Sequence, residues 1–69
     1  MTGSQVDDLM LELGRLRHRQ EALAKRRERL VERVAWYPND VNRRDLAALE
    51  EEQRSLTARI EELQTLLAR

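Results

Sequence analysis

The sequence predicts an all-α fold, an antiparallel two-helix hairpin of the coiled-coil type, which we expect to pair into a four-helix bundle. Three observations support this prediction. Apolar residues recur every seven residues in two separate runs, a spacing typical of helices that pack along a narrow seam. The only proline, Pro38, separates the two runs. Charged residues make up 38% of the chain and aromatic residues 3%, a composition typical of long paired helices.

The first helix is predicted over residues 5–37. Ser4 lies three residues before Asp7, an arrangement in which the serine side chain can accept a hydrogen bond from a free backbone N–H at the helix start. Pro38 has no backbone N–H and disfavours helical geometry at the residue before it. The first helix should therefore end beside this proline.

The turn is predicted at residues 38–41 and the second helix at 42–68. Asn39, Asp40 and Asn42 are all candidate caps for the second helix, and the pattern does not choose among them. Neither glycine nor proline follows the turn, so this helix can continue almost to the end of the chain. With 69 residues, the chain (1–69) has room for one hairpin and not for two domains.

Positions a and d of the heptads form the predicted seam, which we expect to be the core between the helices. Its apolar residues are Leu9, Leu13, Leu16, Leu23, Leu30, Val34, Leu46, Leu49, Leu56, Ile60, Leu63 and Leu67. Three polar residues interrupt it: Gln20, Arg27 and Gln53. Buried polar groups at such positions cost stability but can fix register and oligomeric state. We prefer this explanation to a seam weakened for insertion of a partner helix, and expect Arg27 to extend towards a carboxylate at the rim.

One side of the seam, which we call the e flank, is mostly apolar, small or uncharged. Its positions e include Met10, Arg17, Ala24 and Val31 on the first helix, and Thr57 and Gln64 on the second. A single hairpin buries little apolar surface to offset the entropy lost on folding. We therefore expect a second hairpin or another helical protein to cover the e flank.

The opposite side, which we call the g flank, carries arginines on the first helix and carboxylates on the second. The expected pairs are Arg33 with Asp45 and Arg26 with Glu52, an arrangement that would place Arg19 beside Arg59. Exposed ion pairs contribute only roughly 0–1 kcal/mol each. They should therefore select helix orientation and partner more than they stabilise the fold.

These patterns predict a non-enzymatic protein–protein interaction module, such as an adaptor, assembly factor or small chaperone, that acts through helix–helix packing. The expected partner is a second copy of the chain, another helical protein, or both. The candidate interface residues are Met10, Ala24 and Val31 on the e flank and Trp36 and Tyr37 at the tip of the hairpin. Tryptophan and tyrosine are frequent binding hot spots. The simpler alternative is that Tyr37 closes the last core layer and Trp36 covers the tip.

Two other functions remain alternatives. The first is nucleic-acid binding through a row of arginines, namely Arg15, Arg19, Arg26, Arg29 and Arg33. Glutamates on the same helix and an acidic second helix argue against it. The second is a regulator that inserts its Trp36–Tyr37 tip into a partner enzyme.

Nothing in the pattern predicts a catalytic, cofactor-binding or metal-binding residue. His18 is the only histidine and stands at an outward position f, and the chain has no cysteine and no glycine-rich phosphate loop. Gly14 marks either a close approach of another backbone or a weak point of the first helix. No apolar run approaches the length that spans a bilayer and no signal segment is evident, so we expect a cytoplasmic protein.

Overall fold

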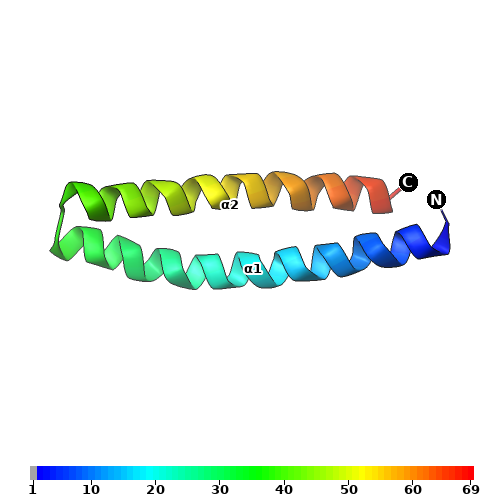
Figure 1. The fold of residues 1–69 in the computed structure, drawn as a ribbon, viewed down its shortest axis with the longest axis horizontal. Helices are drawn as coiled ribbons and strands as arrows, with labels where there is room; N and C mark the ends of the chain where they lie inside the picture. The colour runs from blue at the N-terminus through cyan, green and yellow to red at the C-terminus, as the bar shows by residue number, and fades with distance from the viewer. Residues whose placement is uncertain (1) are drawn as a thin grey trace.

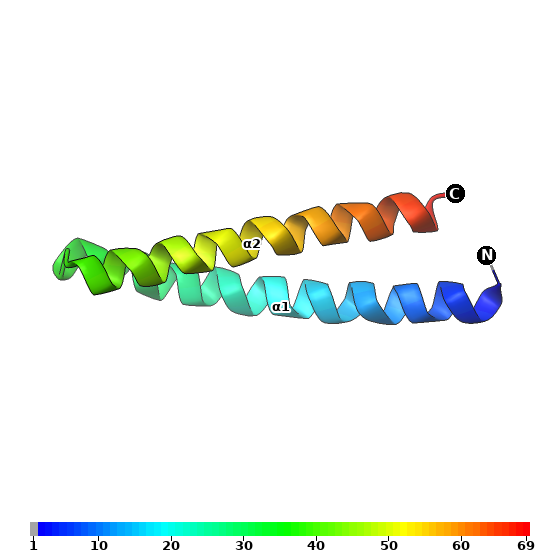
Figure 2. The same ribbon diagram turned by 45° about the horizontal axis from the view of Figure 1, so that its top comes forward.

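The computed structural model describes residues 2–69 and shows two helices packed against each other as an antiparallel pair (Figure 1). Helix α1 comprises Gly3–Trp36 and helix α2 comprises Asp40–Leu67. Figure 1 and Figure 2 show the helices side by side from the turn to the two termini, which lie at the same end. The pair measures 51 × 15 × 14 Å. The all-helical fold and the two-helix packing are thus confirmed.

Helix α1 begins earlier than predicted because Thr2, and not Ser4, caps it. The Gln5 backbone N–H donates to Thr2 Oγ1 at 3.3 Å, and the Thr2 N–H donates to Gln5 Oε1 at 3.1 Å. This reciprocal pair is a capping box, which satisfies two backbone donors at once. Ser4 lies inside the first turn of α1 and is not the capping residue.

The turn is shorter than predicted and consists of Tyr37, Pro38 and Asn39. The Asn39 N–H donates to the Tyr37 carbonyl at 2.8 Å, which closes the chain around the proline. Asn39 is also the cap of α2, since its Oδ1 accepts from the Asn42 N–H at 2.8 Å. Helix α2 therefore begins at Asp40, two residues before the predicted start, and the choice among the three candidate caps is settled.

Asn42 has a second role that the sequence pattern did not suggest. It is 9% exposed, and its Nδ2 donates to the Tyr37 carbonyl at 2.8 Å, so it ties α2 to the end of α1. Asn42 stands one heptad before Leu49, which is the signal that would have identified it as the first d residue of α2. Tyr37, predicted to close this end of the core, is 69% exposed instead.

The core is a single layer of side chains between the helices. Its buried members are Leu13, Leu23, Leu30, Leu49, Leu56, Ile60 and Leu63. The half-buried seam residues are Leu9, Leu16, Val34, Leu46 and Leu67. Leu66, a g residue that the seam did not include, also packs against this layer. All twelve predicted apolar seam residues are therefore buried or half-buried.

The polar seam residues are less buried than expected. Gln53 is half-buried, whereas Gln20 and Arg27 are exposed. On a helix surface position a adjoins position e, so a polar a residue in a two-helix layer is open towards the e flank. Arg27 does extend to a carboxylate, since its Nη2 lies 3.7 Å from Glu50 Oε2.

Gly14 lies in α1 with open space around it. A Cβ built at this position would have no atom of the hairpin within 4 Å, beyond the helix's own backbone. The close approach of another backbone, one of the two sequence explanations, is therefore absent within a single copy. The glycine is a weak point of α1, because it restricts the unfolded chain less than alanine does.

Candidate functional site

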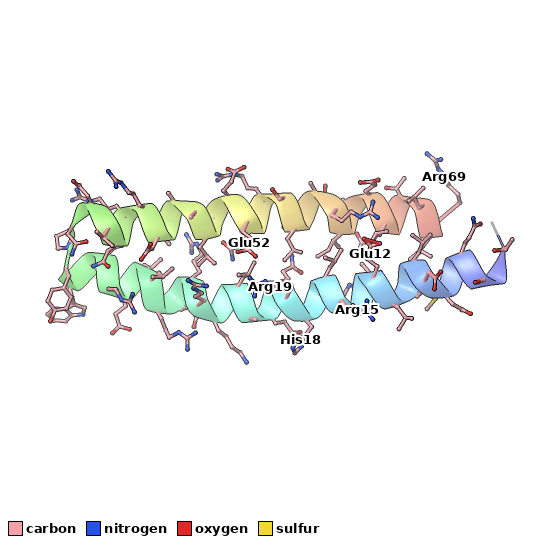
Figure 3. The ribbon with its side chains drawn as sticks, viewed as in Figure 1. Glu12, Arg15, His18, Arg19, Glu52 and Arg69 are labelled. Atoms are coloured by element: carbon pink, nitrogen blue, oxygen red, sulfur yellow. The ribbon has the colours of Figure 1, made fainter. Side chains whose placement is uncertain are left out.

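Ion pairs connect the two helices along the g flank, but they are not the predicted ones. Arg19 Nη2 lies 2.7 Å from Glu52 Oε1, so Glu52 pairs with Arg19 and not with Arg26 (Figure 3). No ion pair joins Arg33 to Asp45 among residues 2–69. The predicted contact of Arg19 with Arg59 is also absent.

Each g residue of α1 lies between two g residues of α2, which are one heptad apart and lie diagonally across from it. The observed ion pairs follow the diagonal that was not predicted. On this diagonal Arg59 reaches Glu12 with two hydrogen bonds of 3.0 Å each, and its Nη1 lies 2.9 Å from Glu62. Hydrogen bonding to Glu12, and then to Glu62, raises the pKa of Arg59. The two observed pairs, Arg19–Glu52 and Glu12–Arg59, each join opposite charges, whereas the predicted diagonal would have brought Arg19 beside Arg59.

Three arginines near the tip lie outside these ion pairs. Arg26, Arg29 and Arg33 border a hollow of about 410 Å³ together with Leu30 and Asp45. None of the three comes within ion-pair distance of a carboxylate in the described part of the chain. The predicted row of five arginines is thus divided, because Arg19 is engaged by Glu52 while this tip cluster keeps its positive charge available.

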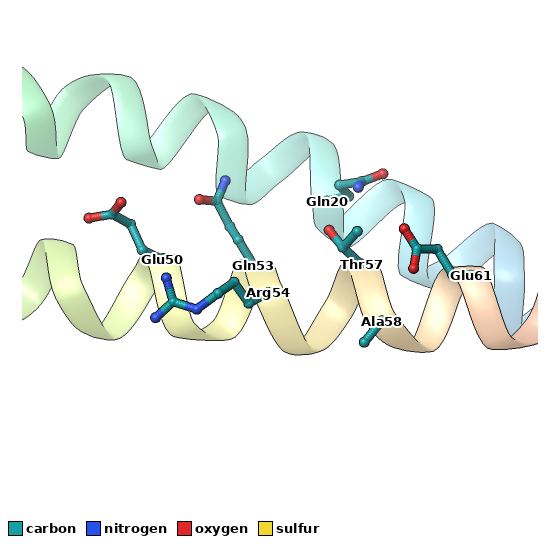
Figure 4. A pocket seen from close by; sticks show the side chains of 7 residues that line it. All are labelled: Gln20, Glu50, Gln53, Arg54, Thr57, Ala58 and Glu61. Atoms are coloured by element: carbon teal, nitrogen blue, oxygen red, sulfur yellow. The ribbon is translucent and has the colours of Figure 1, made fainter.

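The e flank carries a second hollow, at the middle of the hairpin. This groove of about 500 Å³ is lined by Gln20 of α1 and by Glu50, Gln53, Arg54, Thr57, Ala58 and Glu61 of α2 (Figure 4). It lies where the polar seam residues replace leucine, so the core is open to solvent at this level. The structure therefore brings Gln20 and Gln53 together on one surface.

The candidate interface residues of α1 are all uncovered. Met10 is 58% exposed and Val31 is 41% exposed, and Ala24 between them is exposed as well. At the tip Trp36 is 75% exposed and Tyr37 is 69% exposed. The tip aromatics do not cover the core, since their side chains stay in solvent rather than folding over the last core layer.

No three histidine or acidic side chains within residues 2–69 lie close enough to hold a metal ion. His18 is exposed and points away from α2 (Figure 3). Every buried side-chain polar atom described has a hydrogen-bond partner. Neither α1 nor α2 contains an apolar stretch sufficient to cross a lipid bilayer.

No protein-family model matches this chain, and no curated protein or solved structure shows significant similarity to it.

Proposed function

We propose that the chain is a non-enzymatic interaction module that packs the e flank of its hairpin against other helices, as an adaptor, assembly factor or small chaperone. The observation that carries this proposal is the exposure of Met10, Ala24 and Val31 beside an open groove. Apolar side chains aligned on one helix face gain free energy when another apolar surface covers them, and such aligned patches often mark interaction sites.

The surface area of the hairpin supports a need for a partner. It exposes 5455 Å², whereas a globular protein of 8.2 kDa exposes roughly 4,500 Å² by the usual scaling of surface with mass. The excess reflects a core that is one layer thick. Docking of a second pair of helices on the e flank would bury this surface and produce a four-helix bundle.

Light scattering at several protein concentrations tests the proposal. We expect a mass of at least twice 8.2 kDa for the native chain. The Met10→Glu/Val31→Glu variant should lose this association, because it places two charges on the e flank. Leu11→Glu is the matched control, since Leu11 is 61% exposed at an outward position f of the same helix.

Two outcomes would contradict the proposal. One is a folded chain of monomer mass at every concentration, with no change in its melting temperature on dilution. The other is equal loss of association in the Leu11→Glu control. Circular dichroism on the same samples separates loss of association from unfolding, because coupled folding and association makes the melting temperature depend on concentration.

A second candidate function rests on the tip cluster of Arg26, Arg29 and Arg33. Three guanidinium groups without carboxylate partners can bind phosphates of a nucleic acid, and the exposed Trp36 adds a surface on which a base can stack. Asp45 in the same hollow opposes this function.

Fluorescence anisotropy with a labelled single-stranded oligonucleotide tests this candidate. Affinity should fall steeply as salt rises, because phosphate contacts release counterions. Replacing the three arginines by glutamine should abolish binding, whereas Arg43→Gln/Arg44→Gln/Arg69→Gln removes equal charge elsewhere and should preserve it. Absence of binding at low salt, or an affinity that does not change with salt concentration, would rule out this function.

The exposed tip supports a third candidate, a regulator that inserts Trp36 and Tyr37 into a partner enzyme. Replacing both aromatics by alanine separates it from e-flank docking. Self-association through the e flank should survive this change, whereas capture of an enzyme by the tip should not.

A further inference from the structure

The e flank of α1 is arranged symmetrically about its middle. Gln20 stands at the centre of α1, and Gln53 stands at the centre of α2. Met10 lies ten residues before Gln20, and Val31 lies eleven residues after it. A surface with matching residues at equal distances from its centre can pack against a copy of itself that is turned end for end.

We propose that the e flank binds a second copy of this chain in an antiparallel arrangement, with the two tips at opposite ends and Met10 of each copy against Val31 of the other. This inference rests on the proposed function and names its partner. The two-fold axis of the dimer passes close to Gln20 and Gln53, whose amides form a polar layer at its centre.

Apolar matching selects this arrangement over the other two-fold one. With the tips together, α1 would face α2 of the second copy, and Met10 would meet Gln64 while Val31 would meet Arg43. With the tips apart, the two most exposed apolar residues of the e flank cover each other. The contact between Met10 and Val31 then occurs twice in the dimer, because a two-fold interface uses the same surface on each copy.

The charges of the e flank fit the same arrangement. Arg17 would lie against Ala24 of the second copy, a small residue that leaves room for the guanidinium. On α2, Glu50 would lie against Thr57 of the second copy. No like charges meet at the e positions, so the interface avoids the repulsion that would favour dissociation.

The available area suits a dimer. The hairpin presents a face of 51 × 15 Å, so two copies that cover each other fully would bury about 1,500 Å² in total, within the 1,200–2,000 Å² typical of stable protein pairs. The central groove of about 500 Å³ on each copy would be covered by the other copy, which brings four glutamine side chains into one layer. Glutamine amides can donate to and accept from one another, so the polar layer can satisfy itself.

Cysteine cross-linking tests the arrangement directly, because the native chain has no cysteine. Single-cysteine variants Met10→Cys and Val31→Cys are prepared, mixed and oxidised mildly. We expect the mixture to give a disulfide-linked dimer on a non-reducing gel, and each variant alone to give only background. The two positions are about 30 Å apart on one helix, at roughly 1.5 Å per residue, so no bridge can form within a chain.

Leu11→Cys supplies the background from random collisions, since this residue points away from the e flank. A mixture of Met10→Cys with Gln64→Cys reports the arrangement with the tips together. If this mixture cross-links while the Met10→Cys and Val31→Cys mixture stays at background, the antiparallel inference is wrong although the proposed function survives. A native chain that remains a monomer by light scattering overturns both.

Discussion

At the scale of single residues, the stability of the hairpin depends most on the two leucines that are almost completely buried. Leu23 is 1% exposed and Leu63 is 0% exposed, so each fills space that no neighbour can enter without rearrangement. Leu23→Ala should lower the free energy of unfolding by about 2–5 kcal/mol, the range for leucine truncation in cores. Urea unfolding at fixed protein concentration measures the loss.

Leu11→Ala is the matched control for this prediction, because it removes the same atoms from a side chain that is 61% exposed. Its effect should stay within about 0.5 kcal/mol, as for most surface substitutions. Equal losses in the two variants would mean that Leu11 is covered in solution, and that the outward face of α1 is not free.

Asn39 is the capping residue at the start of α2. Its side chain accepts from the Asn42 N–H at 2.8 Å, and removal of such a cap typically costs about 0.5–2 kcal/mol. Asn39→Ala should therefore lower the unfolding free energy by this amount, whereas Asn39→Asp should preserve it. Ser4→Ala should have little effect, because Thr2 caps α1. Thermal unfolding of the three variants checks the order, and a loss in Ser4→Ala as large as in Asn39→Ala would contradict the assigned caps.

At the scale of the helices, the heptads predicted the element type and nearly all of the core. Apolar side chains at a and d must face the partner helix whatever the turn does, so the number, length and inner faces of the helices follow from the sequence. The first residue of α1 could not be predicted in this way, because Ser4 and Thr2 are both good capping residues. Only the side chain three residues later, Gln5, decides between them.

The cross-helix pairs could not be read from the sequence for a different reason. Arg19 has two g residues of α2 within reach, and the spacing does not say which diagonal it takes. The structure selects Glu52, at 2.7 Å. The open groove at Gln20 and Gln53 was missed because a polar residue in the seam was assumed to be enclosed, whereas two helices enclose position a on one side only.

Charge reversal at Arg19 discriminates the two diagonals by the sign of its effect. Arg19→Glu should destabilise the hairpin by up to about 1 kcal/mol, the usual range for an exposed pair, because it places a second carboxylate beside Glu52. On the other diagonal the new glutamate would meet Arg59 and stabilise. Thermal unfolding at low salt measures the change, and Glu52→Arg in the same chain should restore the native value.

At the scale of the whole molecule, a hairpin with a core one layer thick has two sides that differ in character. The g flank carries ion pairs such as Arg19–Glu52 and a hollow lined by arginines near the tip, whereas the e flank has an open groove and uncovered apolar side chains. In the proposed assembly, this asymmetry would direct association to the e flank. The arginines near the tip would remain accessible after the e flank is covered, so both proposed kinds of contact could operate in one assembly.

The central glutamines give the last prediction, which concerns the uniqueness of the assembly. In the antiparallel dimer Gln20 and Gln53 lie in a layer that satisfies its hydrogen bonds only when the copies align at their centres. Gln20→Leu/Gln53→Leu should raise the melting temperature of the dimer, because apolar surface replaces a buried polar layer. It should also relax the register, since sliding one copy along the other no longer leaves amides unpaired.

Cross-linking in this background measures the loss of register. The mixture of Met10→Cys and Val31→Cys should give a weaker bridge. A pair that is one heptad out of register and stays at background in the native sequence, such as Met10→Cys with Ala24→Cys, should begin to react. Gln64→Leu adds apolar area near one end of the e flank without touching the central layer. It should therefore stabilise the dimer and keep the native cross-linking pattern. If the double leucine variant also keeps that pattern, the register depends on the Met10 and Val31 contacts and not on the glutamines.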